Sequence, residues 1–195
     1  MEKCKWCLDG GLMEKYHDDE WGSIVHDDYK HFEYLTLESM QCGLSWAIII
    51  KKREAITKSF ENFDFYKIAS YNDNDIDRIY NTPNMLKSTS KIKATIHNAN
   101  CFINIINQYG SFDNYIWSFT NKRSLVYKKH HLGFFEAKND LSNQISDSLR
   151  KHGFKFIGSV TIYSYLQACG IINDHEINCF KYTKLLNENN CEIIE

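Results

Sequence analysis

Cysteine and histidine residues near the two ends of the chain are candidate metal ligands. His175 and Cys179 are four residues apart, so they share one face if that segment is helical. Cys4 and His17 can supply two further ligands, and two Cys with two His make a closed tetrahedral zinc set. We therefore expect a structural zinc ion that joins the N-terminal segment to the C-terminal one, closing a loop across the whole fold.

Two alternatives for these residues stay open from the residues alone. Cys4 and Cys7 form a CxxC pair, which can bind metal or exchange disulfides, although the βαβ pattern of redox proteins is absent. The run from His175 to Cys179 also resembles the helix of a zinc hydrolase, with Glu176 as the base and Cys179 in place of the second His. Four protein ligands would fill the position that a catalytic zinc keeps open, which favours a structural ion.

A second group of residues has the chemistry to hold a flat cation. Glu38 falls at the edge of an apolar helical stripe, where a carboxylate costs free energy unless it has a partner or a role. Trp6, Tyr16, Trp21 and Trp46 gather in the N-terminal half. Aromatic side chains commonly fill cores, and Glu38 can simply reach water or pair with a lysine. Aromatic rings beside an acidic group, however, can form a cage for a planar cation.

Two interruptions between helices are candidates for contact with nucleic acid. Leu44 lies on a tight bend after Gly43, and an exposed leucine at a bend can act as a wedge between bases, although ordinary packing is commoner. One helix ends at Gly153 and another starts near Ser159, whose unpaired N–H groups would suit a phosphate. The alternative is that Ser159 only caps that helix. The candidate DNA contacts are Gly43, Leu44, Lys155, Gly158 and Ser159.

Helices must position these residues, because the apolar spacing is mostly helical. The pattern predicts helices over 28–42, from Trp46 through Ile50, and over 91–107, 141–152 and 160–169. Asp27 or Asp28 can cap the first of these, and the candidate helix ends are Gly43, Gly110, Gly153 and Gly170. Ile92, Ile96, Ala99, Ile103 and Ile106 should form one buried stripe. The polar, aperiodic region 121–138 reads as a long loop. The predicted fold class is therefore all-α.

Composition narrows the class of protein. The 195 residues, with 43% hydrophobic and 25% charged side chains, suit a single unit over 1–195 with room for two helical subdomains. There is no apolar signal stretch, and the longest apolar run spans only 46–50, which predicts a cytoplasmic protein without membrane contact. Nothing in the sequence requires more than a monomer.

Charge and cysteine count add two further limits. Seven cysteines without a signal segment argue against a disulfide framework, and Cys42, Cys101 and Cys169 read as core residues. A net charge of −2 is not the bulk signature of a nucleic-acid binder. Any contact with DNA must then come from local basic patches at 51–53 and 151–155.

Taken together, these motifs resemble those of the DNA-3-methyladenine glycosylase I family, bacterial members of the helix-hairpin-helix glycosylase superfamily. The likeness spans about nine tenths of the chain, up to Tyr182, and is poor over 121–140. The matching stretches are 4–6, 16–22, 37–38, 43–46, 51–54, 153–158, 167–170 and 173–175.

The resemblance implies a role for each candidate residue. It implies that the zinc ligands are Cys4, His17, His175 and Cys179. It also implies that Glu38 and Tyr16 hydrogen-bond the excised base and that Trp46 stacks on it, while Trp6 and Trp21 line or support the pocket. Leu44 matches the residue beside the gap left by the flipped nucleotide, and 153–159 matches the hairpin that grips phosphate.

The activity implied by the resemblance is base excision. The protein is expected to act on alkylated double-stranded DNA, to flip out 3-methyladenine and to release it by hydrolysis without strand cleavage. The competing hypothesis is a non-catalytic helix-hairpin-helix module that binds DNA, which needs 153–159 but neither Glu38 nor Trp46.

Overall fold

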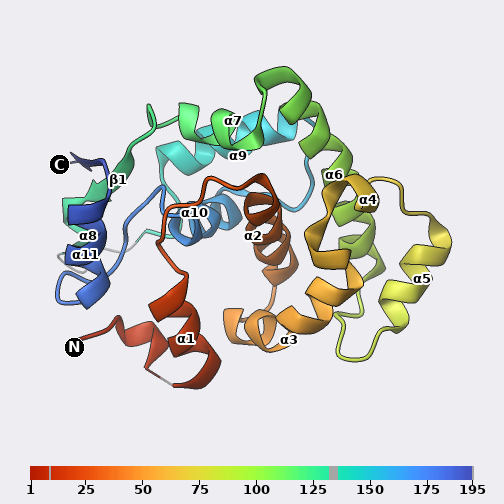
Figure 1. The fold of residues 1–195 in the computed structure, drawn as a ribbon, viewed down its shortest axis with the longest axis horizontal. Coiled ribbons are helices and arrows are strands. Elements are labelled where there is room, and N and C mark those ends of the chain that lie inside the picture. The colour runs from red at the N-terminus through yellow and green to blue at the C-terminus, as the bar shows by residue number, and fades with distance from the viewer. Residues whose placement is uncertain (9, 132–135, 195) are drawn as a thin grey trace.

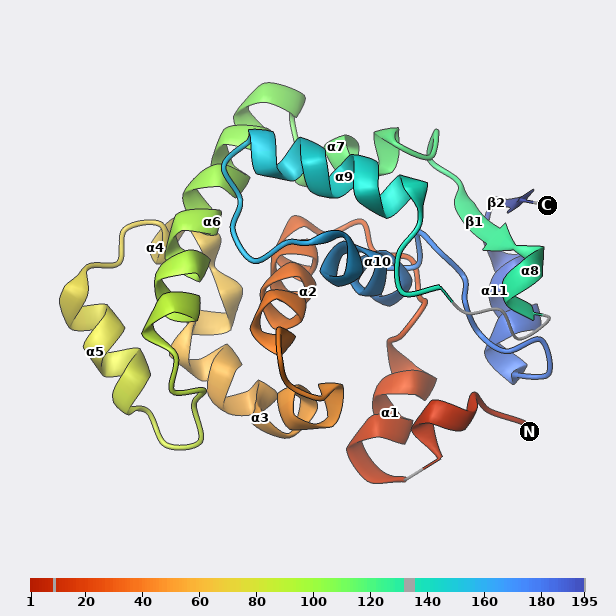
Figure 2. The same ribbon diagram turned by 180° about the vertical axis from the view of Figure 1, so that it is seen from behind.

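Helices make up most of the molecule (Figures 1 and 2). The computed structural model describes residues 1–8, 10–131 and 136–194. The α-helices are α1 (Gly11–Asp19), α2 (Asp28–Gln41), α3 (Trp46–Ser59), α4 (Phe65–Ile68), α5 (Asp73–Asn81), α6 (Thr89–Tyr109), α7 (Phe112–Ser118), α8 (Lys128–His131), α9 (Asp140–Lys151), α10 (Ser159–Ala168) and α11 (Phe180–Glu188). Short 3₁₀ turns occupy Lys5–Cys7 and Glu61–Phe63.

Helix α2 lies in the middle of the fold and is surrounded by other elements (Figure 1). Asp27 caps its start by accepting a hydrogen bond from the Lys30 N–H, as its sequence position predicts. Residues 34–40 are all buried, so α2 does not have the single apolar face that the sequence indicated. The predicted edge residue Glu38 is therefore deep in the protein, while Cys42 lies beyond the helix and is only half-buried.

The long helix α6 packs along one side of α2. Its predicted range is confirmed, and Ile92 and Ala99 are fully buried. Ile103 and Ile106, however, are only half-buried, and the core positions beside them are Phe102 and Ile105. The buried stripe is rotated by about one residue because α6 contacts α4 and α7 as well as α2.

The predicted loop over 121–138 is partly wrong. Strand β1 (Ser124–Tyr127) and helix α8 lie within it, although 132–135 fall outside the described residues. Strand β1 pairs in parallel with β2 (Cys191–Ile194), with Ser124 opposite Cys191 and Tyr127 opposite Ile194. The two strands are far apart in the sequence, so no local pattern predicts that they pair. The class is mostly helical rather than purely α. None of the helices in the described ranges combines the length and apolar character needed to cross a bilayer.

Gly170 lets the end of α10 pack directly against the chain that leads into α2. Its φ is +76°, and a Cβ there would lie 2.8 Å from the Gly22 carbonyl oxygen and from the backbone of Ser23 and Ile24. The Val25 N–H donates to the carbonyl of Cys169, the residue before Gly170, at 3.2 Å. Only glycine therefore suits this crossing.

We expect Gly170→Ala to lower the free energy of unfolding by about 3 kcal/mol, since it combines backbone strain with a clash against main chain that cannot move aside. Gly110→Ala is the matched control, because Gly110 has a φ of +85° but a Cβ there would make only an ordinary contact, 3.6 Å from the Asn114 side chain. Denaturant unfolding of both variants measures the difference. Equal losses in the two variants would show that the close approach at Gly170 has no energetic weight.

Candidate active site

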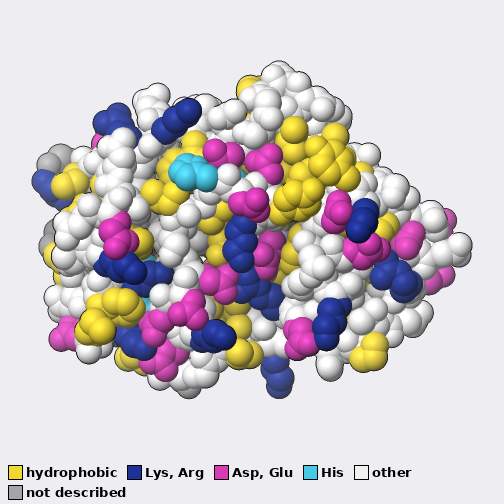
Figure 3. Space-filling view, viewed as in Figure 1, with side chains coloured by type: hydrophobic (Ala, Val, Ile, Leu, Met, Phe, Trp, Pro, Cys, Tyr) yellow, Lys and Arg dark blue, Asp and Glu magenta, His cyan; other side chains and the backbone are white. Residues whose placement is uncertain are grey.

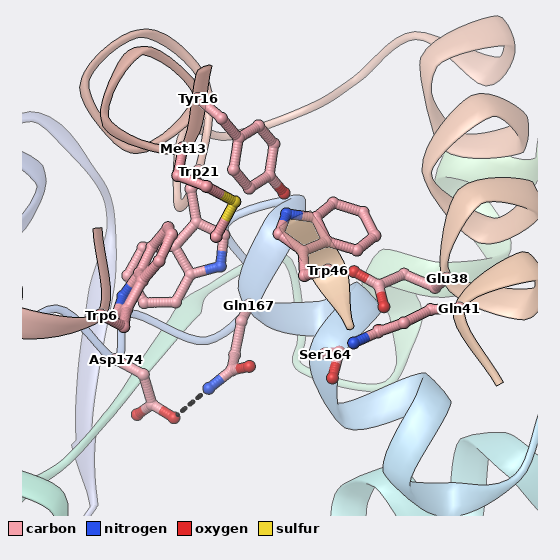
Figure 4. Close-up of a pocket in the computed structure, with 10 residues that line it drawn as sticks. All are labelled: Trp6, Met13, Tyr16, Trp21, Glu38, Gln41, Trp46, Ser164, Gln167 and Asp174. Atoms are coloured by element: carbon pink, nitrogen blue, oxygen red, sulfur yellow. Dashed lines mark hydrogen bonds between the residues drawn. The ribbon is translucent and has the colours of Figure 1, made fainter. Parts of the chain in front are cut away.

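A cavity of about 340 Å³ opens between α1, α2, α3 and α10, a volume at the lower end for small-molecule pockets (Figure 4). Five of its wall residues are those singled out in the sequence as a possible cage for a cation: Trp6, Tyr16, Trp21, Glu38 and Trp46. The other wall residues are Met13, Gln41, Ser164, Gln167 and Asp174. The structure thus brings the acidic and aromatic candidates together around one space.

Glu38 is the buried carboxyl group of this cavity. It is 4% exposed, and its Oε2 atom has no hydrogen-bond partner among the described residues. Burial raises the pKa of Glu38 to about 8. A cation or a hydrogen-bond donor that enters the cavity would stabilise this buried, unpaired carboxyl group.

Two aromatic residues beside Glu38 also carry unused polar groups. The Tyr16 hydroxyl and the Trp46 indole nitrogen are buried without a hydrogen-bond partner in the described part of the chain. The two rings lie 5.4 Å apart and are tilted by 53°, and Figure 4 shows both polar atoms on the side of the cavity where Glu38 lies. Buried unpaired polar groups are rare in proteins, so three at one cavity indicate a polar ligand.

The opposite wall is formed by Trp6 and Trp21, whose rings meet edge to face at 5.0 Å. This wall packs on two histidines: Trp6 lies 5.4 Å from His17, and Trp21 lies 4.4 Å from His175. Any displacement of these histidines would therefore move the wall of the cavity.

The four predicted zinc ligands converge behind that wall. The ligand atoms of Cys4, His17, His175 and Cys179 all lie within 4.8 Å of one another, and all four residues are buried. The sulfur–nitrogen separations are 3.5 Å from Cys4 to His175, 3.4 Å from Cys179 to His17 and 3.6 Å from Cys179 to His175. Tetrahedral zinc with its usual bond lengths requires about 3.5 Å between sulfur and nitrogen, so the cluster fits this ion.

The outer contacts of the two histidines also suit a metal. The Nδ1 of His17 lies 2.8 Å from Asp18, and the Nε2 of His175 lies 3.1 Å from the Trp21 carbonyl oxygen. Each ring then directs its other nitrogen at the cluster, as metal-binding histidines do. Burial lowers the pKa of His17, and it lowers the pKa of His175 to about 3, so both rings are in the neutral form that binds metal.

The local geometry of this cluster corrects one prediction. Residues 173–179 are not helical, and Cys179 instead stands at the N-cap of α11. Cys7 is buried and donates to the Cys4 carbonyl oxygen, and it is not part of the cluster. The Glu176 carboxylate accepts from the Lys5 N–H at 2.7 Å, which argues against its use as a hydrolytic base.

Comparison with known proteins identifies the family. Residues 6–182 match the methyladenine glycosylase family. The chain belongs to this family. It is 36% identical over 182 residues to DNA-3-methyladenine glycosylase 1 of Escherichia coli, which covers 93% of this chain and 97% of that protein. It is 34% identical over 177 residues to DNA-3-methyladenine glycosylase of Haemophilus influenzae, covering 91% and 96%.

A solved structure of the same family agrees with this fold. It describes the structural basis of 3-methyladenine recognition by 3-methyladenine DNA glycosylase I from Staphylococcus aureus. The two chains superimpose with a TM-score of 0.88 at 34% identity, covering 93% of this chain and 97% of that one. The methyladenine glycosylase fold therefore extends over almost the whole protein.

The predicted DNA contacts of this glycosylase lie outside the cavity. Leu44 is 37% exposed on the bend after α2, where Gly43 has a φ of +79°. Lys155 is exposed in the connection between α9 and α10. Gly158, not Ser159, is the N-cap of α10, and no side chain caps that end. The alternative in which Ser159 merely caps the helix is thus wrong.

One of the two predicted basic patches is also wrong. Arg53 points into the protein, where it binds Glu20 with two hydrogen bonds of 2.8 Å and Glu33 at 2.6 and 2.9 Å. Lys52 donates to the Asn84 carbonyl oxygen. Figure 3 shows acidic and basic side chains interspersed on the face viewed there. Arg53, in the middle of α3, instead joins the C-cap of α1 to α2, and all three helices supply residues of the cavity.

We expect Arg53→Met to destabilise the fold by about 2 kcal/mol, because Glu20 and Glu33 lose the Arg53 guanidinium and keep only Lys30 as a cationic partner; partial exposure reduces the usual loss for a buried pair. Burial alone would raise the pKa of Glu20, but the hydrogen bonds and charge of Arg53 lower it to about 2. Glu20 thus contributes stability above pH 4.5 that is lost as the pH falls toward 2. Urea unfolding at several pH values should show this acid loss shrinking in Arg53→Met. Lys58→Met, at an exposed ion pair, is the control with little expected effect.

Sequence reasoning missed half of the cavity wall. Ser164 and Gln167 are three residues apart on α10 and share one face, but no pattern indicated which face it was. Asp174 accepts hydrogen bonds from Tyr163 at 2.5 Å and from Gln167 at 2.8 Å, and its other oxygen lies 2.7 Å from His130. His130 is in the region that was predicted to be a loop, so this network was not foreseeable.

Proposed function

We propose that this protein is a DNA repair glycosylase that flips 3-methyladenine out of alkylated duplex DNA and hydrolyses its bond to deoxyribose. The observation that carries the proposal is the cavity in which Glu38, Tyr16 and Trp46 each keep an unpaired buried polar atom. Membership of the methyladenine glycosylase family supports the same reading. We further propose that it acts as a single catalytic unit and a monomer.

Discrimination follows from charge. Methylation at N3 makes the adenine of a nucleotide cationic, and flipping it costs a few kcal/mol of unstacking. Stacking on Trp46 stabilises the flipped cationic base by roughly 0.5–2 kcal/mol through cation–π attraction. Glu38 accepts hydrogen bonds from the amino edge of the base, and its charge favours the cation. Unmodified adenine is neutral and gains less from that carboxylate.

The chemical step needs little help, because the cationic base is a good leaving group. The bond between the sugar C1′ and the base breaks, and its electron pair leaves with the base as the sugar becomes oxocarbenium-like. The oxygen of water then bonds to C1′ and releases one proton. Among the described residues, those lining the cavity include no lysine that would form a covalent intermediate, which supports hydrolysis without strand cleavage.

Two further parts of the proposal concern the scaffold. Cys4, His17, His175 and Cys179 would hold a structural zinc ion, which would tie the N-terminal segment to the start of α11 and support the Trp6–Trp21 wall. The segment from α9 to α10 would grip DNA as a helix-hairpin-helix, and Leu44 would stand beside the gap left by the flipped nucleotide.

The test is incubation with methylated duplex DNA, followed by chromatography of the released bases. We expect 3-methyladenine in the supernatant, with 7-methylguanine left in the DNA and the strands intact. Binding to DNA without release of any base would overturn the proposal and favour the non-catalytic module.

A further inference from the structure

The connection between α9 and α10 runs beside helix α6, and side chains of α6 bond to its backbone (Figure 2). We call residues 153–158 the hairpin loop. The side-chain oxygen of Asn98 accepts from the Lys155 N–H at 2.8 Å, and its amide nitrogen donates to the Lys155 carbonyl at 2.9 Å. Asn98 is only 5% exposed. One buried amide therefore satisfies both main-chain groups of Lys155 and fixes the orientation of the loop backbone.

Two further side chains hold neighbouring carbonyl groups of the same loop. His97 Nε2 lies 2.8 Å from the Gly153 carbonyl oxygen, and the Ser146 hydroxyl of α9 donates to the Ile157 carbonyl at 2.8 Å. With Lys155, every second carbonyl of the loop is thus held by a side chain. The N–H groups of residues 156–158 have no partner in the described part of the chain, and such groups suit a phosphate.

The same helix also holds the bend that carries Leu44. The Nζ of Lys91 donates to the carbonyl oxygens of Met40 at 2.8 Å and Cys42 at 2.7 Å, at the C-terminal end of α2. Lys91 and Asn98 are seven residues apart, so they lie on one face of α6 about 10 Å apart along its axis. One rigid helix therefore carries the supports of both the bend and the hairpin loop.

We propose that α6 sets the spacing between the Leu44 bend and the hairpin loop on DNA, with Asn98 and Lys91 as positioning residues. The proposal rests on the proposed function, since it assumes that both segments touch the duplex around a flipped nucleotide. A fixed spacing matters because the gap in the duplex and the phosphate gripped beside it belong to one continuous strand. Positioning of this kind contributes to the binding of DNA and not to the binding of the free base in the cavity.

The test compares Asn98→Ala with the wild type on two ligands. On a duplex that contains an uncleavable abasic analogue, we expect the Kd of the variant to rise at least tenfold. The slope of log affinity against log salt should become shallower by about one, because a displaced loop would no longer hold the exposed Lys155 ammonium against a phosphate. The Kd for free 3-methyladenine should stay within twofold and kcat at saturating DNA within threefold. Asn100→Ala is the matched control, because Asn100 is exposed on α6 and bonds Ala69 and not the hairpin loop.

Three outcomes separate the possible failures. If Asn98→Ala lowers the melting temperature but matches Asn100→Ala in duplex affinity and salt slope, Asn98 is only structural and the proposal is wrong. If Asn98→Ala does not fold, Lys91→Met and His97→Ala replace it in the same comparison. Each should lose at least threefold in duplex affinity, and no loss in either variant would overturn the proposal. If the wild type releases no 3-methyladenine, the proposed function itself fails.

Discussion

Glu38→Gln should fold like the wild type and lose about 100-fold in kcat/KM for release of 3-methyladenine. The amide keeps the shape of the side chain but cannot carry the negative charge that favours a cationic base, and a buried charged hydrogen bond is worth about 2–3 kcal/mol. Single-turnover excision from methylated duplex DNA measures the loss. Glu54→Gln, at an exposed position on α3, is the control for a neutralised carboxylate.

The pH dependence should separate the charge of Glu38 from its shape. Burial raises the pKa of Glu38 to about 8. Below that pH, the ionised fraction of Glu38 therefore increases about tenfold for each pH unit. We expect kcat/KM to rise with pH and to level off near 8, and the Glu38→Gln profile to lack that rise. The raised pKa also means that the folded state binds more protons than the unfolded state between pH 4.5 and 8, so this group makes stability fall as pH rises. Wild-type excision by Glu38→Gln would remove Glu38 from the mechanism.

Cys4→Ser should lose bound zinc and melt at least about 10 °C below the wild type, because metal binding at a closed four-ligand site contributes directly to folding. Zinc analysis and thermal unfolding of the purified protein provide the measurement. Cys7→Ser is a closely matched control, since Cys7 is equally buried, three residues away and outside the ligand cluster. A serine hydroxyl there can still donate to the Cys4 carbonyl oxygen.

The outcome also tests how the two sites are linked. The Trp6–Trp21 wall packs on His17 and His175, so removal of the metal should weaken binding of 3-methyladenine as well as stability. Chelation that abolishes excision while the fold and the free-base affinity stay intact would instead favour a catalytic ion and Glu176 as its base.

Local signals in the sequence predicted the parts of the fold that local interactions determine. Asp27 and Gly110 mark the start of α2 and the end of α6 as expected. The partners of Arg53 could not be predicted, because Glu20 and Glu33 are far from it in sequence and meet it only after α1, α2 and α3 pack. The pairing of β1 with β2 was missed for the same reason.

The candidate site also has residues that local signals indicated and properties that depend on long-range packing. Residue types and family resemblance pointed to Glu38 and Trp46, but no local pattern indicated that α2 is enclosed on nearly all sides. That enclosure is what leaves the Glu38 carboxyl unpaired and shifts its pKa. Gln167 and Asp174 lay within stretches that match the family, yet their place in the cavity depends on how α10 is rotated and on contact with His130.

The most direct test of the cavity is a fluorescence titration of the wild type and Glu38→Gln with free 3-methyladenine and with adenine. The wild type should bind 3-methyladenine at least tenfold more tightly than adenine, and the difference should disappear in Glu38→Gln while Trp46 still reports binding. Released 3-methyladenine is neutral, but it is a stronger base than adenine and can take up the proton of the buried Glu38 carboxyl, which pairs the two charges. Equal affinity of the wild type for both bases, or an unchanged preference in Glu38→Gln, would contradict the assignment of this cavity to a cationic purine.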